Sequence, residues 1–139
     1  MVEKTLVILK PDCMGKNLYG DVLLRFSRAS LEIVAGKMVW LNEDRLKQHY
    51  DFLVDKPFFP EIVRFMMSRP VLIFVLKGEG AIGRVRELLG PTDSTLAPKG
   101  TIRGDMGKDK SQNLVHASDS PEAAEKEIGR FFGREEIFG

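Results

Sequence analysis

The sequence has one cysteine, Cys13, and two histidines, His49 and His116, among its 139 residues. A lone cysteine cannot form an internal disulfide, and so few histidines and cysteines provide no ligand cluster for a structural zinc site. These shortages exclude a disulfide-stapled scaffold and a zinc finger.

A strong charge of one sign and long apolar runs are missing as well. Twenty-one Lys and Arg against 20 Asp and Glu give a formal net charge of +1, so no overall field draws the chain onto nucleic acid or an anionic membrane. The longest apolar run, residues 71–76, is far shorter than the roughly 20 residues of a membrane-spanning helix. The apolar stretch near the start of the sequence is too short for a signal peptide. We therefore expect a cytoplasmic protein that binds neither membranes nor a specific nucleic acid, and any anion site must be local.

The composition is that of a globular chain, with 43% hydrophobic and 29% charged residues. The length suits a single core, so we expect residues 1–139 to form one domain.

Apolar periodicity predicts strands that alternate with helices. Strands are predicted at residues 5–9, 32–41, 71–76 and 113–116. The helices between them are predicted from inward-facing apolar positions, which are Val22, Leu23, Phe26 and Ala29, then Leu46, Tyr50 and Leu53, then Ile62, Val63, Phe65 and Met66, then Ile82, Val85, Leu88 and Leu89, and finally Ala124, Ile128, Phe131 and Phe132. The pattern indicates an α/β sandwich of at least four strands and leaves parallel and antiparallel pairing both open.

Residues 91–112 show no apolar periodicity and are predicted to form a long loop. Loops of this length in a compact domain are usually functional or disordered, and we favour a functional loop here.

Residues 78–83 match the G-x-G-x-x-G pattern of a dinucleotide site and stand between a predicted strand and a predicted helix. The acidic residue that such a site needs about 20 residues later is represented only by Asp105, inside the long loop. A plain glycine-rich turn explains the motif better, although a dehydrogenase stays open as a third interpretation. No phosphate-binding P-loop sequence is present, so side chains must hold any phosphates.

Basic and neutral polar residues at element ends and in the long loop are candidates for binding phosphate. They are Lys10, Arg86, Lys99 and Arg103, with Thr92 and Asn113 as neutral donors. A guanidinium suits the task because its planar fork matches phosphate oxygens. Any one of these residues taken alone is equally explained as a solvated charge.

His116 stands at the end of a short predicted strand and could be a nucleophile. An imidazole attacks through one nitrogen when a carboxylate fixes the other, and Glu127 on the following helix could be that carboxylate. A structural role for His116 is the alternative, and His49 is interpreted as structural because no acidic, serine or cysteine partner is evident for it. Phe58 and Phe59 form a pair that is either core or a stacking surface for a base.

Several segments taken together resemble the nucleoside diphosphate kinase family. The segment Asn113-Leu-Val-His116-Ala-Ser118-Asp-Ser resembles the signature of that family. Further motifs in matching order are Lys10-Pro-Asp, Pro57-Phe-Phe, Arg69-Pro70-Val, Gly90-Pro-Thr92 and Gly100-Thr-Ile-Arg103-Gly-Asp. They cover nearly the whole chain, and this many motifs in matching order argue strongly against a chance resemblance.

The resemblance implies a ferredoxin-like, four-stranded antiparallel sheet covered by helices. It implies that His116 is the phosphorylated nucleophile, supported by Glu127 and Ser118, with Tyr50 beside it and Lys10 also catalytic. The residues implied to hold phosphates and ribose are Lys10, Arg86, Thr92, Arg103 and Asn113, and the implied slot for the base is Phe58 with Ile62.

Three features depart from the family pattern. Ala117 stands where a glycine commonly follows the histidine, and Ser94 stands where a proline is common in the loop. The chain also ends at Gly139, without the C-terminal extension of longer members, and so resembles the short prokaryotic type. No departure falls on an expected phosphate ligand.

The implied activity is transfer of the terminal phosphate of a nucleoside triphosphate to a nucleoside diphosphate, in two half-reactions through phosphohistidine at His116. The substrates would include ATP, GTP and others, with broad tolerance of base and sugar, and the role would be to maintain nucleoside triphosphate pools. Mg²⁺ is expected to arrive on the nucleotide, because no carboxylate cage is evident. The resemblance also implies a homotetramer or homohexamer. A non-enzymatic regulator that binds nucleotide in the same slot is the alternative from another class.

Overall fold

The computed structural model describes all residues, 1–139, and contains one four-stranded sheet in the order β2-β3-β1-β4. The strands are β1 (Val2–Leu9), β2 (Glu32–Val39), β3 (Val71–Glu79) and β4 (Val115–Ala117). Every pairing is antiparallel, with Leu6 opposite Val75 and Ile8 opposite both Ile73 and His116. The expected ferredoxin-like antiparallel sheet covered by helices is confirmed. No helix is long and apolar enough to cross a membrane.

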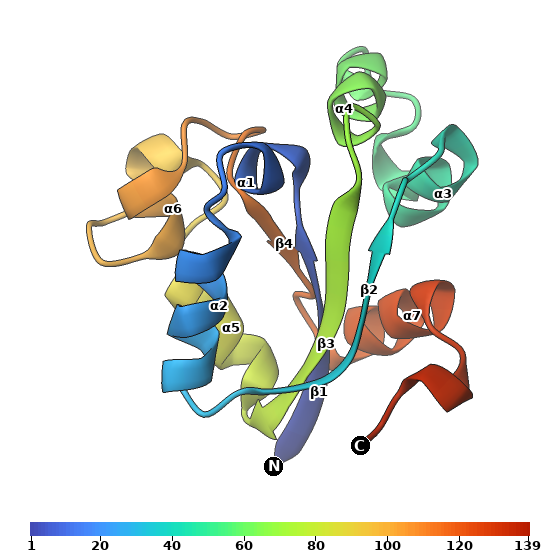
Figure 1. Cartoon of the computed structure of the whole chain (residues 1–139). Helices are drawn as coiled ribbons and strands as arrows, with labels where there is room; N and C mark the ends of the chain where they lie inside the picture. The colour runs from blue at the N-terminus through green and yellow to red at the C-terminus, as the bar shows by residue number, and fades with distance from the viewer.

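Helices connect the strands and cover both faces of the sheet (Figure 1). They are α1 (Pro11–Gly15), α2 (Tyr19–Arg28), α3 (Glu43–His49), α4 (Phe59–Met66), α5 (Ala81–Leu89), α6 (Ile102–Met106) and α7 (Pro121–Phe131). Short 3₁₀ turns lie at η1 (Asp51–Leu53), η2 (Ser94–Leu96) and η3 (Arg134–Glu136). In Figure 1, α2 and α5 lie on one side of the sheet and α7 on the other.

The sheet divides the core into two apolar layers because side chains alternate along a strand. Val7 and Leu9 of β1 pack with α2 and α5, whereas Leu6 and Ile8 pack with residues of α3, α4 and α7. Both layers cover β1, whose central residues are fully buried. The same alternation in β4 puts Val115 and Ala117 in the first layer, so the side chain of His116 lies on the α7 side of the sheet.

Two predicted elements differ from the structure. The helix predicted from Leu46, Tyr50 and Leu53 ends at His49, and Leu53 lies in the separate turn η1. The predicted loop 91–112 contains the regular helix α6, which begins after Thr101, whose side chain accepts a hydrogen bond from the Gly104 backbone N–H. That short helix has one fully buried apolar residue, Ile102, which is too few to produce a visible periodicity.

The glycine-rich segment 78–83 is a strand-to-helix turn, and the dehydrogenase interpretation is wrong. The dinucleotide fingerprint belongs to a parallel βαβ unit, whereas β3 pairs antiparallel with both neighbours. Two backbone N–H groups of the turn are also occupied, since Gly80 donates to the Met1 carbonyl and Ile82 to the Glu3 carboxylate.

Candidate active site

One cavity of about 1080 Å³ gathers Lys10, which follows β1, with residues from α3, α4, α5, the long loop, β4 and α7. Ten of the expected site residues line it, and these are Lys10, Tyr50, Phe58, Ile62, Arg86, Thr92, Arg103, Asn113, His116 and Glu127. Ser118 is fully buried behind the wall, in contact with Glu127. Lys99, considered with the other cations, does not line the cavity. Residues far apart in the sequence therefore converge on one pocket.

His116 is oriented by Glu127. The Glu127 carboxylate accepts hydrogen bonds through Oε1 from His116 Nε2 and from the Ser118 hydroxyl, both at 2.8 Å. Burial alone raises the pKa of Glu127, but the bonds from His116 and Ser118 outweigh burial and lower it below its usual value. The carboxylate is therefore ionised at neutral pH and fixes the proton of His116 on Nε2, which leaves the Nδ1 lone pair without a protein partner.

Ser118 is in turn attached to the central strand. Its backbone N–H donates to the Leu6 carbonyl at 3.1 Å, and its hydroxyl oxygen accepts from the Leu6 N–H at 3.2 Å. The orientation of Glu127 therefore depends on the most deeply buried part of the sheet.

Arg103 is held by backbone carbonyls on three sides. Its guanidinium donates to Asn113 at 3.3 Å, to Gly90 at 2.9 Å and to Val115 at 2.6 Å. Three of its five N–H groups are thus used within the protein, and the others are free for a ligand. Burial, together with the neighbouring Arg86, lowers the pKa of Arg103 to about 10, which keeps its charge at neutral pH.

Gly90 makes its own contact with Arg103 feasible. It ends α5 with a φ of +84°, a conformation that favours glycine, and a Cβ there would lie 2.8 Å from the Thr101 hydroxyl. A larger residue would push the long loop away from α5.

Lys10 and Asn113 form a second polar contact in the cavity. Lys10 Nζ donates to the Asn113 side-chain oxygen at 2.8 Å and to the Ser111 carbonyl at 2.9 Å. Asn113 Nδ2 donates to the carbonyls of Thr92 and Lys110. Burial lowers the pKa of Lys10 to about 8, an effect that the Asp12 charge opposes and the Arg103 charge reinforces.

The backbone between Asn113 and His116 is strained. Leu114 has a φ of +75°, and the Val115 N–H donates to the Asn113 carbonyl, which closes a three-residue γ-turn. The turn is held by the Asp12 carboxylate, which accepts from the Leu114 N–H, and by the Lys10 N–H, which donates to the Leu114 carbonyl. Such a turn persists only when its surroundings over-determine it, and here it directs Asn113 and His116 into the same cavity.

An aromatic and aliphatic wall faces these polar groups. Phe58 is 47% exposed and lines the cavity with Ile62, whereas Phe59 is buried in the core. The pair that was ambiguous in the sequence therefore divides, with one ring in the core and one at the cavity.

Three residues of the site were missed in the sequence. His49, interpreted as structural from the sequence, lines the cavity, and its ring centroid lies 4.4 Å from that of His116. Phe65 also lines the cavity, with Lys10 Nζ 5.8 Å from its ring centroid, and Asp12 holds the strained turn. No local signal marks His49, because its partners come from the other end of the chain.

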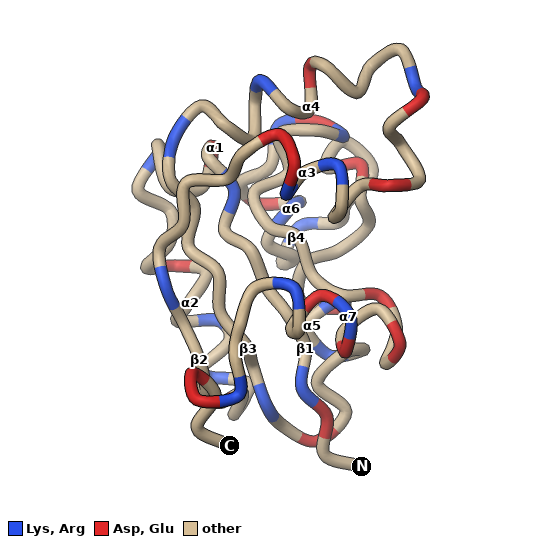
Figure 2. Tube along the Cα trace, turned by 90° about the vertical axis from the view of Figure 1, so that its right-hand side faces the viewer, with Lys and Arg blue, Asp and Glu red and all other residues tan.

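Five cations line the cavity, together with four carboxylates, and neither charge dominates the chain as a whole. Figure 2 shows Lys and Arg interspersed with Asp and Glu along the chain. Lys10, Arg86 and Arg103 nevertheless all line the one cavity, which makes it the candidate for the local anion site expected from the sequence.

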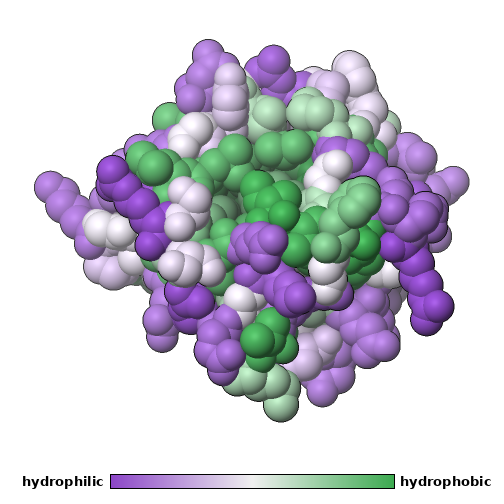
Figure 3. Space-filling model, turned by 60° about the horizontal axis from the view of Figure 1, so that its bottom comes forward, coloured by the Kyte–Doolittle hydropathy of each residue, from purple (hydrophilic) through white to green (hydrophobic).

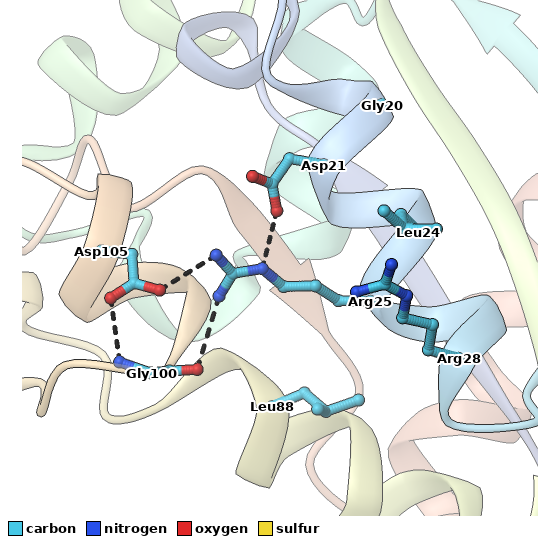
Figure 4. A pocket seen from close by; sticks show the side chains of 8 residues that line it. All are labelled: Gly20, Asp21, Leu24, Arg25, Arg28, Leu88, Gly100 and Asp105. Carbon is cyan, nitrogen blue, oxygen red and sulfur yellow. Dashed lines mark hydrogen bonds and ion pairs between the residues drawn. The ribbon is translucent and has the colours of Figure 1, made fainter.

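A second, smaller pocket of about 600 Å³ lies between α2 and the long loop (Figure 4). Its central residue, Arg25, bonds Asp21 at 2.7 Å and Asp105 at 2.9 Å and also donates to the Gly100 carbonyl. Its charge is thus matched by two carboxylates, and the contacts attach the loop that carries Arg103 to α2.

Comparison with known proteins agrees with this geometry. The sequence profile described as Nucleoside diphosphate kinase matches residues 3–137. A nucleoside diphosphate kinase of Staphylothermus marinus is 47% identical over 97% of this chain and 96% of its own length. The crystal structure of the Aquifex aeolicus nucleoside diphosphate kinase superposes with a TM-score of 0.92 at 46% identity, covering 99% of both chains. This chain belongs to the nucleoside diphosphate kinase family. Its activity is the transfer of phosphate between nucleotides.

A halophilic nucleoside diphosphate kinase from Halobacterium salinarum, solved in complex with CDP, superposes with a TM-score of 0.96 at 40% identity, covering 100% of this chain and 93% of that one. The prokaryotic relatives match the family type expected from the sequence.

The departures from the nucleoside diphosphate kinase pattern have visible consequences. The Ser94 N–H donates to the Asp109 carbonyl at 3.2 Å, a bond that a proline could not make. Ala117 is buried with its methyl in the first apolar layer, and its carbonyl accepts a hydrogen bond from Arg86 Nη1 at 3.5 Å.

We predict that Leu114→Gly is more stable than Leu114→Ala, by about 1 kcal/mol in the free energy of unfolding. Both variants lose the same buried side chain, but only glycine adopts φ +75° without strain. Urea unfolding measures the difference. The control is Ala124→Gly in α7, which should be destabilised by about 1 kcal/mol. A Leu114→Ala variant that is more stable than Leu114→Gly would contradict the strained turn.

We also predict that kcat/KM falls as pH rises through about 8. The folded pKa of Lys10 is lowered to about 8, so Lys10 is charged below that pH and loses the charge that attracts phosphate above it. Lys10→Arg should keep the profile flat through this range, since arginine stays protonated. An identical alkaline limb in both enzymes would assign that limb to another group.

Proposed function

We propose that the transfer proceeds in two half-reactions through phosphohistidine on His116. The Nδ1 lone pair attacks the terminal phosphorus of a nucleoside triphosphate, the bond from that phosphorus to the bridging oxygen breaks, and the electron pair leaves with the nucleoside diphosphate. A terminal phosphate oxygen of a second diphosphate then attacks the phosphohistidine and regenerates neutral His116. Atoms and charge balance without any external acid, oxidant or reductant.

The bond between His116 Nε2 and Glu127 carries this proposal. Phosphorylation at Nδ1 makes the ring cationic while Nε2 keeps its proton. An ionised carboxylate 2.8 Å away stabilises that cation, and it does so equally for the forward and the return transfer.

The cations of the cavity supply electrostatic stabilisation. Phosphoryl transfer passes through a loose transition state with charge spread over the equatorial oxygens, so positioning and charge matter most. We assign Lys10, Arg86 and Arg103 to the phosphate oxygens, with Thr92 as a neutral donor to phosphate. Both N–H groups of the Asn113 amide already bind carbonyls, so we assign Asn113 to accept a ribose hydroxyl through Oδ1. Tyr50 adds a hydroxyl beside His116, and burial raises the pKa of Tyr50, so it remains a protonated donor.

Broad base tolerance follows from the cavity wall. Phe58 with Ile62 offers a flat apolar surface, and stacking accepts any base because every base has a π-face. We infer that purine and pyrimidine nucleotides bind alike, which suits a role in maintaining the triphosphate pools.

Mg²⁺ fits the site as part of the nucleotide substrate. Glu61 and Asp119 are exposed carboxylates on the cavity wall without a hydrogen bond to the protein, while Asp109 and Glu127 are already engaged. Two free carboxylates and no cage suit an ion that keeps several waters and is bound mainly by the phosphates of the nucleotide. The ion supplies charge neutralisation on the phosphates, and the residues named above supply the rest.

We also propose that the chain assembles into a homotetramer or homohexamer. The edge strand β2 exposes Ile33 and Met38, and Trp40 follows it at 63% exposure. The end of the sheet with both termini also exposes apolar side chains, Val2 and Phe138 among them, and Figure 3 shows apolar surface there. Native mass spectrometry counts the chains, and a monomer at micromolar concentration would overturn the assembly.

Replacing His116 tests the proposed function. His116→Gln should abolish transfer of the terminal phosphate and labelling by γ-labelled ATP, while ADP binding measured by calorimetry persists. In the unaltered protein the label should map to His116 after an alkaline quench and be removed by several diphosphates. Binding of ATP without label in the unaltered protein would favour the non-enzymatic regulator instead.

Replacing Phe58 tests the stacking surface. Phe58→Ala should weaken binding of ADP, GDP and CDP by similar factors, roughly 5- to 150-fold, since stacking is worth about 1–3 kcal/mol. Tyr19→Ala, which removes an exposed ring on α2 outside the cavity, is the control. A loss confined to one base would contradict the inferred tolerance.

A further inference from the structure

His49 lies against His116 in a closely packed aromatic group. Its ring is 4.4 Å from the His116 ring, centroid to centroid, at an interplanar angle of 76°. Tyr50 and Phe131 contact the other sides of the His49 ring, at 4.7 and 5.9 Å between centroids. His49 is only 7% exposed, so its ring restricts the orientations open to His116.

Arg130 determines which nitrogen of His49 carries the proton. Arg130 Nη1 lies 3.0 Å from His49 Nδ1. A guanidinium only donates, so Nδ1 must accept and the proton of neutral His49 must be on Nε2. Burial lowers the pKa of His49 to about 3, and the electrostatic effect of His116 is the second cause. The His49 ring therefore stays neutral throughout the physiological pH range.

The proton on Nε2 also excludes another use of this cluster. One ring nitrogen of His49, one ring nitrogen of His116 and one carboxylate oxygen of Glu127 lie within 4.8 Å of one another, close enough to suggest a metal site. A metal on Nε2 would force the His49 proton onto Nδ1, against the N–H of Arg130. Metal-bound histidines instead donate their second N–H to an acceptor. The donor Arg130 at Nδ1 therefore favours a protonated Nε2 on His49 over a metal-bound one.

His49 Nε2 is buried without any hydrogen-bond partner. A Glu127 carboxylate oxygen lies within 4.8 Å of a His49 ring nitrogen, but His116 and Ser118 already use that carboxylate. If the His49 ring rotated, its N–H would compete with His116 for that carboxylate, and His116 would lose the bond that keeps Nδ1 unprotonated. The Arg130 contact opposes this rotation.

We propose that Arg130 and His49 are positioning residues for the transfer, with Arg130 fixing the tautomer and rotation of His49 and the His49 ring fixing that of His116. The inference rests on His116 being the phosphorylated residue. Helix α7 provides both halves of the arrangement, since Glu127 and Arg130 lie three residues apart on one helix face. Arg130 itself does not line the cavity, so it affects the chemistry only through His49.

Single-turnover phosphorylation by ATP tests the pair in the intact protein. Arg130→Met should lower the rate of His116 phosphorylation about tenfold, because a nucleophile that is slightly misplaced loses rate steeply, with the KM for ATP changed less than twofold. Arg130→Lys, which keeps a cationic donor, should recover part of the rate. The control is Arg134→Met, since Arg134 is exposed and its side chain makes no hydrogen bond in the structure, and its rate should stay within twofold of the unaltered protein.

Nitrogen-15 NMR of labelled histidine provides the second readout. In the unaltered protein His49 should carry its proton on Nε2 only, and in Arg130→Met the two tautomers should mix. A proton on Nδ1 of His49 in the unaltered protein overturns the proposal even if the variants do not fold. A normal phosphorylation rate in Arg130→Met with a changed tautomer overturns it as well. Failure of the unaltered protein to form phosphohistidine is a different result, which rejects the proposed function itself.

Discussion

The buried guanidinium of Arg103 connects the parts of the active site. By donating to the carbonyls of Gly90, Asn113 and Val115, it joins the end of α5, the segment before β4 and β4 itself. Each carbonyl is an acceptor that would be costly to bury unpaired. The guanidinium that we assign to binding phosphate therefore also orders the loop. The same side chain would hold the ligand and connect the segments that line the cavity.

Bringing cations together in a half-buried cavity costs free energy, and an anionic ligand lowers that cost. The lowered pKa values of Lys10 and Arg103 both have burial as their main cause, and nearby positive charge adds to it. Phosphate oxygens would supply the missing opposite charge. The protein thus keeps a site strained in two respects, by like charges and by the turn at Leu114, and anchors both to the rigid strands β1 and β4. Such preorganisation suits a reaction in which the protein mainly positions groups and stabilises charge.

The apolar pattern of the sequence predicted the strands and helices whose formation depends on neighbouring residues. The strands at 71–76 and 5–9 and the helix around Val85 were predictable because their apolar residues follow a clear period, and the antiparallel pairing came from the family resemblance. Helix α6 was not predicted, since five residues with one buried apolar side chain carry no period. The importance of His49 was also hidden, because its partner Arg130 is 81 residues away and only the packing of α3 against α7 brings them together. The roles of Lys10 and Arg103 were anticipated as charges, but their backbone contacts could not be read from spacing.

The central claim is that Glu127 holds His116 by Nε2 so that Nδ1 attacks phosphorus. The most direct measurement is NMR of the phosphorylated protein labelled with nitrogen-15 in histidine, in which coupling to phosphorus identifies the bonded nitrogen. The account predicts coupling to Nδ1 of His116, with the proton retained on Nε2. Coupling to Nε2, or to a nitrogen of His49, would contradict it.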